Sequence, residues 1–247
     1  MPDVLGYRAK FGVLGPSTNT VVEPDYYMMS PHGVTAHYGR IYISDQRLTN
    51  DDQFEALLEQ IRGAIEQTVR EVVTCEPDYM VMGMSAETFW GGKEGNEEFT
   101  RKIERWSNMK VATGADACRR ALAIFNVKRI GVITPYQPVG DAQVRRFFTE
   151  CGFDVVALKG LKRPSAVAIA HTTEDMLRDA ILEVNTSDAD AIVQVGTNLS
   201  MVRLADEAER WLKKPVIAIN AATWWHALRE NGITDQMRGF GTLLREY

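Results

Sequence analysis

The sequence predicts an α/β protein made of two pseudo-symmetric halves, each a doubly wound parallel sheet, with a two-sided pocket between them. The first observation behind this prediction is that short apolar runs alternate with longer stretches of helical period along the chain. The second is that three segments recur in the same order, which indicates an internal duplication. The matching segments are 11–19 with 130–138, 77–90 with 189–202, and 109–122 with 214–228.

The predicted strands are short and mostly free of polar residues. They lie at 11–14, 33–44, 79–84, 110–112, 129–133, 154–158, 191–195 and 216–219. Most are apolar almost without interruption, as expected where helices cover both faces of a parallel sheet. The run 33–44 differs, because its apolar and polar residues alternate.

The longest predicted helix covers 51–73, where apolar residues recur at spacings of three and four, and Asn50 or Asp51 can serve as its N-cap. Similar stripes predict helices at 174–184, 201–212 and 222–230. No low-complexity linker interrupts the alternation, so the halves should pack closely. We place them at residues 1–125 and 126–247, and allow for a terminal element exchanged between them.

Composition and charge exclude several classes of function. The net charge is -5 and no Lys/Arg run is longer than a pair, which argues against binding to nucleic acid or to a membrane surface. We expect a cytoplasmic protein, because the sequence shows neither a leader pattern nor an apolar stretch of about 20 residues. Three cysteines without C-x-x-C spacing and four scattered histidines predict no metal site.

The most informative segments are the four loops that follow the strands ending near Leu14, Met82, Ile133 and Val195. In such sheets, ligands bind outside the carboxyl ends of the strands. These loops are rich in Gly, Ser, Thr and Asn, whose short side chains leave backbone N–H groups free to bind an anion. Any one of them could be an ordinary turn or N-cap, but four at equivalent strand ends favour a carboxylate site.

Motifs in these loops resemble those of maleate cis-trans isomerases. The first loop reads GPSTNTVVEP at 15–24, the third reads ITPY at 133–136, and GTNLS at 196–200 is similar to the Cys-Thr-Asn-Leu motif of that group. The segment MGMSAETFW at 82–90 is similar in place to the first-half motif. Over nearly its whole length the chain resembles the maleate isomerase and arylmalonate decarboxylase branch of the Asp/Glu racemase superfamily.

The resemblance implies a cofactor-independent enzyme for a small mono- or dicarboxylic acid, with its active site between the halves and a homo-oligomeric assembly. It matches Asn19 to the family's carboxylate-binding asparagine and Tyr136 to its pocket tyrosine. Donors of this kind would stabilise an enediolate-type anion. The predicted substrate-binding residues are Asn19, Ser17, Gly83, Met84, Ala86, Gly196, Thr197 and Asn198.

The chain departs from the family at the positions of its two cysteines. The internal repeat places Gly83 and Gly196 there, and a shift of one residue in the first half would place Met84 instead. None of these residues can carry a proton or act as a nucleophile in the usual way. None of the three cysteines falls at either position, which argues against thiol-pair racemisation and against cysteine addition to an alkene.

Three residues are the predicted catalytic candidates that could replace the thiols. Tyr136 could donate a proton or only hydrogen-bond the carboxylate. Glu87 could transfer protons if burial raises its pKa, or be a simple helix N-terminal acid. Ser85 lies in the sequence GMSAE, which matches the G-x-S-x-G nucleophile elbow except for the final Gly. Other candidates are His171 and His226 as acid/base groups, Arg40 as a carboxylate clamp, and Phe89 and Trp90 as an apolar lining. Each can also be a core or surface residue, and for His226 a packed helix start is favoured.

The missing thiols favour decarboxylation through a stabilised enediolate-type anion. Loss of CO2 mainly requires a site that stabilises this anion, and the proton can come from another acid or from water. Three alternatives stay open. They are a hydrolase or ring-opening enzyme that uses Ser85 or activated water, a maleate-type isomerase that works without thiols, and a non-catalytic carboxylate-binding protein.

Overall fold

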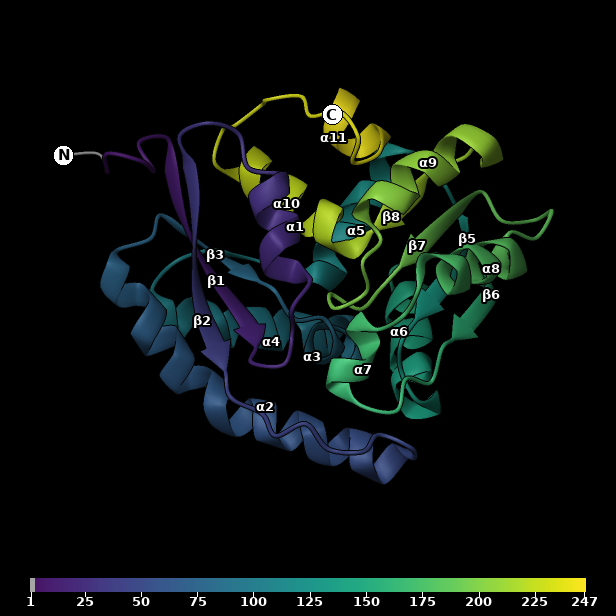
Figure 1. The fold of residues 1–247 in the computed structure, drawn as a ribbon, viewed down its shortest axis with the longest axis horizontal. Coiled ribbons are helices and arrows are strands. Elements are labelled where there is room, and N and C mark those ends of the chain that lie inside the picture. Colours follow the sequence, from purple (N-terminus) through teal and green to yellow (C-terminus); the bar gives the residue numbers. More distant parts are fainter. Residues whose placement is uncertain (1–2) are drawn as a thin grey trace.

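Two four-stranded parallel sheets form the framework of the protein in the computed structural model, which describes residues 3–247 (Figure 1). The sheets have the orders β2-β1-β3-β4 and β6-β5-β7-β8, so one strand order occurs twice. The strands are β1 (Ala9–Pro16), β2 (Val34–Ile41), β3 (Tyr79–Met82), β4 (Val111–Ala112), β5 (Arg129–Thr134), β6 (Asp154–Gly160), β7 (Ala191–Gln194) and β8 (Val216–Ala218). The predicted α/β fold of two doubly wound parallel-sheet halves is confirmed.

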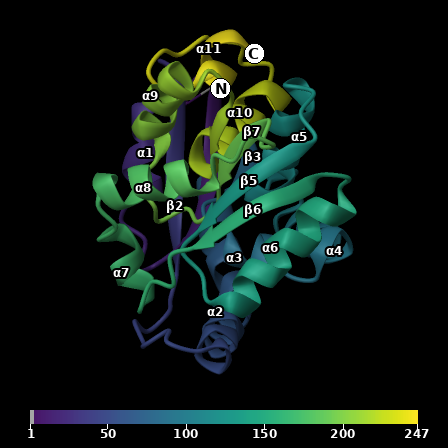
Figure 2. The same cartoon turned by 90° about the vertical axis from the view of Figure 1, so that its right-hand side faces the viewer.

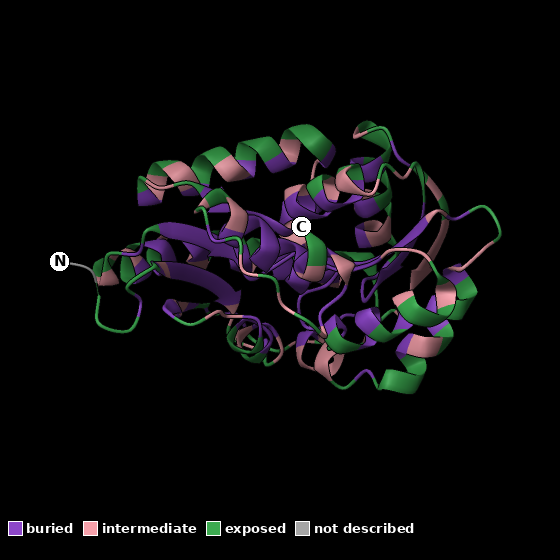
Figure 3. Ribbon diagram, turned by 90° about the horizontal axis from the view of Figure 1, so that it is seen from above, coloured by how far each residue is buried: buried purple, intermediate pink, exposed green. Residues whose placement is uncertain are grey.

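Helices cover both faces of the sheets, and Figure 2 shows α6 and α8 on opposite sides of β5 and β6. Figure 3 shows most strands buried and the outer faces of the helices exposed, while the edge strand β6 is only partly buried. The helices are α1 (Val22–Met28), α2 (Asp51–Val72), α3 (Ala86–Phe89), α4 (Gly92–Ser107), α5 (Gly114–Ile124), α6 (Pro138–Glu150), α7 (Ala166–Ala170), α8 (Glu174–Val184), α9 (Val202–Leu212), α10 (Ile219–Glu230) and α11 (Thr242–Glu246). A single 3-10 turn, Val73–Cys75, follows α2.

The predicted bounds of α2 and α8 hold to within one residue, whereas one strand end and one helix start are wrong by three residues. Asn50 is the N-cap of α2, since its side chain accepts from the Gln53 N–H at 2.9 Å. The strand predicted at 33–44 ends instead at Ile41, because its partner β1 ends at Pro16, opposite Ile41. The helix predicted at 222–230 begins at Ile219, directly after β8.

Helix α10 follows the second sheet but packs on the first half, against α1, β3 and β4. Its Trp224 stacks on Tyr26 of α1, with ring centroids 4.6 Å apart, and meets the edge of Phe11 of β1 at 5.2 Å. The Trp224 indole N–H donates to the Met29 carbonyl at 2.8 Å. The boundary between residues 125 and 126 stays a prediction, but one late helix clearly joins both halves.

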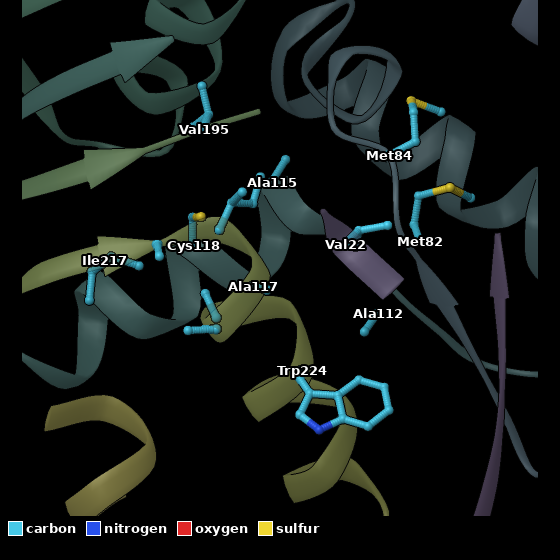
Figure 4. Close-up of a cluster of buried hydrophobic side chains, with 14 of the residues drawn as sticks. Val22, Met82, Met84, Ala112, Ala115, Ala117, Cys118, Val195, Ile217 and Trp224 are labelled. Carbon is cyan, nitrogen blue, oxygen red and sulfur yellow. The ribbon is translucent and has the colours of Figure 1, made fainter. Parts of the chain in front are cut away.

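The core is continuous between the halves. Figure 4 shows one buried cluster that takes side chains from strands and helices of both. Its labelled members are Val22, Met82, Met84, Ala112, Ala115, Ala117, Cys118, Val195, Ile217 and Trp224. Because the halves share this core, the loops at their facing strand ends are held rigidly relative to one another.

Within residues 3–247, no helix is both long and apolar enough to cross a membrane. The same part of the chain contains no group of three or more His, Cys, Asp or Glu side chains arranged to hold a metal ion.

Candidate active site

A cavity lies between the two halves, at the carboxyl ends of β1, β3, β5 and β7. It encloses about 490 Å³ of empty space, counted out to its open mouth. All four strand-end loops predicted from the sequence contribute to it. Its lining residues are Pro16, Thr18, Asn19, Ile43, Leu48, Phe54, Leu57, Ile61, Met84, Ser85, Ala86, Pro135, Tyr136, Ala166, Ile169, Gly196, Thr197 and Asn198.

One side of the cavity, which we call the polar wall, consists of Asn19, Ser85, Tyr136, Thr197 and Asn198. The hydroxyls of Ser85 and Tyr136 share a hydrogen bond of 2.7 Å. The Thr197 backbone N–H donates to Ser85 Oγ at 3.2 Å, and Asn19 Nδ2 donates to Thr197 Oγ1 at 3.0 Å. Two of these residues come from the first half and three from the second, so the polar wall joins the halves.

Both asparagines of the polar wall are fixed by further hydrogen bonds. Asn19 Oδ1 accepts from two backbone N–H groups at the start of α1, at 2.9 and 3.0 Å. Asn198 Oδ1 accepts from the Thr20 N–H at 3.0 Å, and its Nδ2 donates to the Ala166 carbonyl at 3.0 Å. Each amide nitrogen has two hydrogens and uses one here, which leaves one from each side chain for a ligand.

Tyr136 is the only titratable side chain among the described residues that line the cavity. Burial raises the pKa of Tyr136 well above its ordinary value, and the hydrogen bond with Ser85 opposes this only in part. Its backbone N–H donates to Thr134 Oγ1 at 3.1 Å, and Thr134 donates to the carboxylate of Asp141 on α6. The phenol is therefore protonated at neutral pH and held in place by β5 and α6.

The two glycines predicted at the cysteine positions lie in different surroundings. Gly196 lines the cavity with φ of +104°, and a Cβ there would lie 2.6 Å from the Pro135 ring. Gly83 does not line the cavity, because it is still hydrogen-bonded to Leu14 of β1 at 2.7 Å. The side chain that reaches the cavity at this place is that of Met84.

A group of apolar lining residues, which we call the apolar wall, was missed from the sequence. It consists of Ile43, Leu48, Phe54, Leu57, Ile61 and Ile169. Three of these six side chains belong to the apolar stripe of α2, from which we predicted a helix but no part of the site. The signal was present, because such a stripe on a helix beside strand-end loops can face a ligand as well as a sheet.

Phe89 and Trp90, which we considered for that apolar role, do not line the cavity. Phe89 is fully buried against Phe147, with ring centroids 5.2 Å apart. Trp90 lies behind the wall, beside the ring of Phe54 and under the guanidinium of Arg62 at 5.8 Å.

Glu87 is not brought together with the other predicted catalytic residues. Its carboxylate accepts two hydrogen bonds from Arg62, at 2.7 and 3.0 Å, outside the cavity. Burial raises the pKa of Glu87, and the bonds from Arg62 oppose that rise. Ser17 also lies outside the lining, where its hydroxyl bonds the backbone of Ile43 at 3.1 and 3.3 Å and so holds the apolar wall.

The other candidates lie elsewhere. Arg40 pairs with Glu23 and donates to the Asn19 carbonyl at 2.6 Å, so it supports the first loop from behind. His226 is buried within α10, 3.6 Å from Glu230, and His171 is exposed at the end of α7. None of the three cysteines lines the cavity.

Comparison with known proteins identifies a family. A family model described as arylmalonate decarboxylase matches residues 16–244. A maleate isomerase from Pseudomonas putida is 23% identical over 249 residues, which covers 95% of this chain and 96% of the relative.

Solved structures show the same fold. A mutant of Nocardia farcinica maleate cis-trans isomerase with a covalently bound succinylcysteine intermediate matches with a TM-score of 0.87 at 20% identity, over 97% of this chain and 99% of that one. A liganded mutant of arylmalonate decarboxylase matches with a TM-score of 0.81 at 19% identity, over 97% of this chain and 100% of that one.

Proposed function

The chain belongs to the arylmalonate decarboxylase family, and on that premise we propose that it decarboxylates malonate-type acids that carry an apolar, aryl-sized substituent. It is an enzyme of the maleate isomerase and arylmalonate decarboxylase type, as the sequence resemblance predicted. Of the two reactions, decarboxylation fits the cavity better.

The composition of the cavity lining carries the proposal. The cavity combines a polar wall of uncharged donors with an apolar wall. Among its described lining residues, only Tyr136 has a titratable side chain. The free hydrogens on Asn19, Thr197 and Asn198 suit a carboxylate that stays on the product. A second carboxylate would face the apolar wall. Because it is charged before the reaction and leaves as neutral CO2, apolar surroundings favour its loss.

The proposed step balances without a thiol. The bond between the α-carbon and the leaving carboxylate breaks, and its electron pair spreads from the α-carbon onto the retained carboxylate as an enediolate. The Tyr136 hydroxyl then gives its proton to the α-carbon, which is a far stronger base than a phenolate, and the phenolate regains a proton from solvent. Either hydroxyl can donate in the bond between Ser85 and Tyr136, so Ser85 can stabilise the phenolate oxygen.

Hydrolysis through Ser85 is the second candidate, favoured by the place of its hydroxyl in the polar wall. Ser85 Oγ accepts from the Thr197 N–H and shares a hydrogen bond with Tyr136. None of the hydrogen bonds of this hydroxyl within residues 3–247 involves a histidine or a carboxylate, which a serine nucleophile needs as its base.

A Ser85→Ala variant separates these two roles. We expect CO2 release to fall about tenfold, because the variant loses only the support of the Tyr136 oxygen. The measurement is kcat with an arylmalonate, compared with a Thr88→Ser control that keeps a hydroxyl outside the lining. Complete loss of turnover in the folded Ser85→Ala protein would favour a serine nucleophile instead.

The proposed reaction is tested by offering phenylmalonate, malonate and maleate to the purified protein and following CO2 release and NMR signals. We expect CO2 from phenylmalonate, a slower release from malonate because it does not fill the apolar wall, and no change in maleate. Fumarate without CO2 would support a thiol-independent isomerase. Calorimetric binding of these acids without any turnover would support a non-catalytic binding protein.

The homo-oligomer and the cytoplasmic location stay predictions. Light scattering on the purified protein checks the first, and fractionation of the source cells checks the second.

A further inference from the structure

A buried carboxyl group lies behind the polar wall and takes no part in the proposed step. Asp25, on α1, is only 2% exposed, and its Oδ2 accepts from Asn220 Nδ2 at 2.8 Å. The same amide nitrogen donates its other hydrogen to the Thr197 carbonyl at 3.0 Å. Asn220, on the first turn of α10, is also 2% exposed. A three-membered chain thus runs from α1 through α10 to the second-half loop.

Thr197 is the residue through which this chain reaches the cavity. Its N–H contacts Ser85 and its hydroxyl contacts Asn19, so a shift of this loop would move both contacts. The Thr197 carbonyl points the other way, to Asn220. Asn220 therefore holds the loop from outside, and Asp25 fixes the orientation of Asn220.

One polar atom in this series of hydrogen-bonded residues lacks a partner. Asn220 Oδ1 is buried and has no hydrogen-bond partner within residues 3–247. A buried acceptor without a partner destabilises the folded protein. An ionised Asp25 cannot donate a hydrogen bond to Asn220 Oδ1, because a carboxylate only accepts. A protonated Asp25 has an O–H that it can offer to the Asn220 amide.

We propose that Asp25 and Asn220 are positioning residues, which hold the Thr197 peptide in the polar wall and make carboxylate binding depend on the charge of Asp25. This inference rests on the proposed binding of a carboxylate by the polar wall. The pair acts through Thr197 and touches neither substrate nor reacting atoms.

The electrostatic surroundings place this charge change near neutrality. Burial raises the pKa of Asp25 to about 7, while the hydrogen bond from Asn220 and the charge of Arg203 on α9 oppose the rise. On α1 itself, the carboxylate of Glu23 is paired with Arg40 of β2. A bound carboxylate repels an ionised Asp25, so binding favours the protonated form and takes up a proton. Affinity is therefore higher below pH 7 and falls as pH rises through it.

The first test needs no ligand. The amide resonances of Thr197 and Asn198 are followed by NMR from pH 5.5 to 8.5 in the wild type, in Asp25→Asn and in a Glu66→Gln control. We expect both resonances to titrate with a midpoint near pH 7 in the wild type and control, and to stay constant in Asp25→Asn. Asparagine at this position mimics the protonated acid, since it can accept from one Asn220 atom and donate to the other.

The second test measures binding of phenylacetate, which is fully ionised over this range, by calorimetry at pH 6.0 and 8.5. We expect about fivefold weaker binding at the higher pH in the wild type, and equal affinities in Asp25→Asn. Asn220→Ala should bind more weakly at both pH values while its fold persists by circular dichroism.

The inference is overturned if the two amides do not titrate in the wild type, or if a folded Asp25→Asn protein keeps the wild-type titration. Failure of the decarboxylase proposal looks different. In that case no CO2 is released from phenylmalonate, while the NMR titration and its loss in Asp25→Asn remain.

Discussion

Replacing Tyr136 with phenylalanine is expected to lower kcat for arylmalonate decarboxylation by about 10²- to 10⁴-fold, the usual contribution of a positioned general acid. The variant removes one oxygen and keeps the ring against Phe54, at a centroid distance of 5.3 Å in the wild type. Binding of phenylacetate should weaken far less, because Asn19, Thr197 and Asn198 still hold the carboxylate. The measurement is CO2 release under saturating phenylmalonate, with affinity taken from calorimetry.

The matched control is Tyr79→Phe, at the start of β3 and outside the cavity lining. It removes a hydroxyl from another buried tyrosine and should leave kcat within about twofold of the wild type. If Tyr136→Phe retained wild-type kcat, the proton would have to come from water, and Tyr136 would only bind the carboxylate.

Replacing Gly196 with alanine is expected to lower the free energy of unfolding by about 3 kcal/mol and to reduce turnover. The position has φ of +104°, which a side chain rarely adopts, and the new Cβ would lie 2.6 Å from two atoms of the rigid Pro135 ring. Relief of that contact would push apart the loops that carry Tyr136 and Thr197. Urea denaturation gives the stability, and the phenylmalonate assay gives the turnover.

Gly152→Ala is the control for the backbone effect, because Gly152 has φ of +87° and a Cβ added there would meet nothing within 4 Å. We expect a loss of about 1 kcal/mol there, with unchanged turnover. Equal losses at the two glycines would mean that the contact with Pro135 is relieved without cost. The comparison therefore separates the cost of the left-handed backbone from the cost of the contact with Pro135.

The strand ends and their loops could be predicted from the sequence because local residue types determine them. Unbroken apolar runs indicate buried strands, and the Gly, Ser and Asn residues that follow them indicate loops. The duplication then predicted that the loops converge, and Asn19, Ser85, Tyr136 and Thr197 do line one cavity. The apolar wall was missed because an α2 stripe that covers a sheet and one that also faces a ligand look alike in sequence.

The surroundings of individual charged groups could not be predicted, because they depend on tertiary contacts. Glu87 follows a predicted pocket loop, yet Arg62, 25 residues earlier on α2, holds its carboxylate outside the cavity. Asp25 and Asn220 are separated by 195 residues and meet only because α10 packs on the first half. No spacing rule relates such pairs.

The central claim is that this cavity promotes decarboxylation without a thiol, with Tyr136 as proton donor. The most direct measurement uses a cysteine-free protein, Cys75→Ser, Cys118→Ala and Cys151→Ser, incubated with phenylmalonate in D2O. We expect CO2 release at close to the wild-type rate and phenylacetate with one deuterium on its α-carbon. If the folded cysteine-free protein released no CO2 where the wild type did, or if neither released any, the claim would be contradicted.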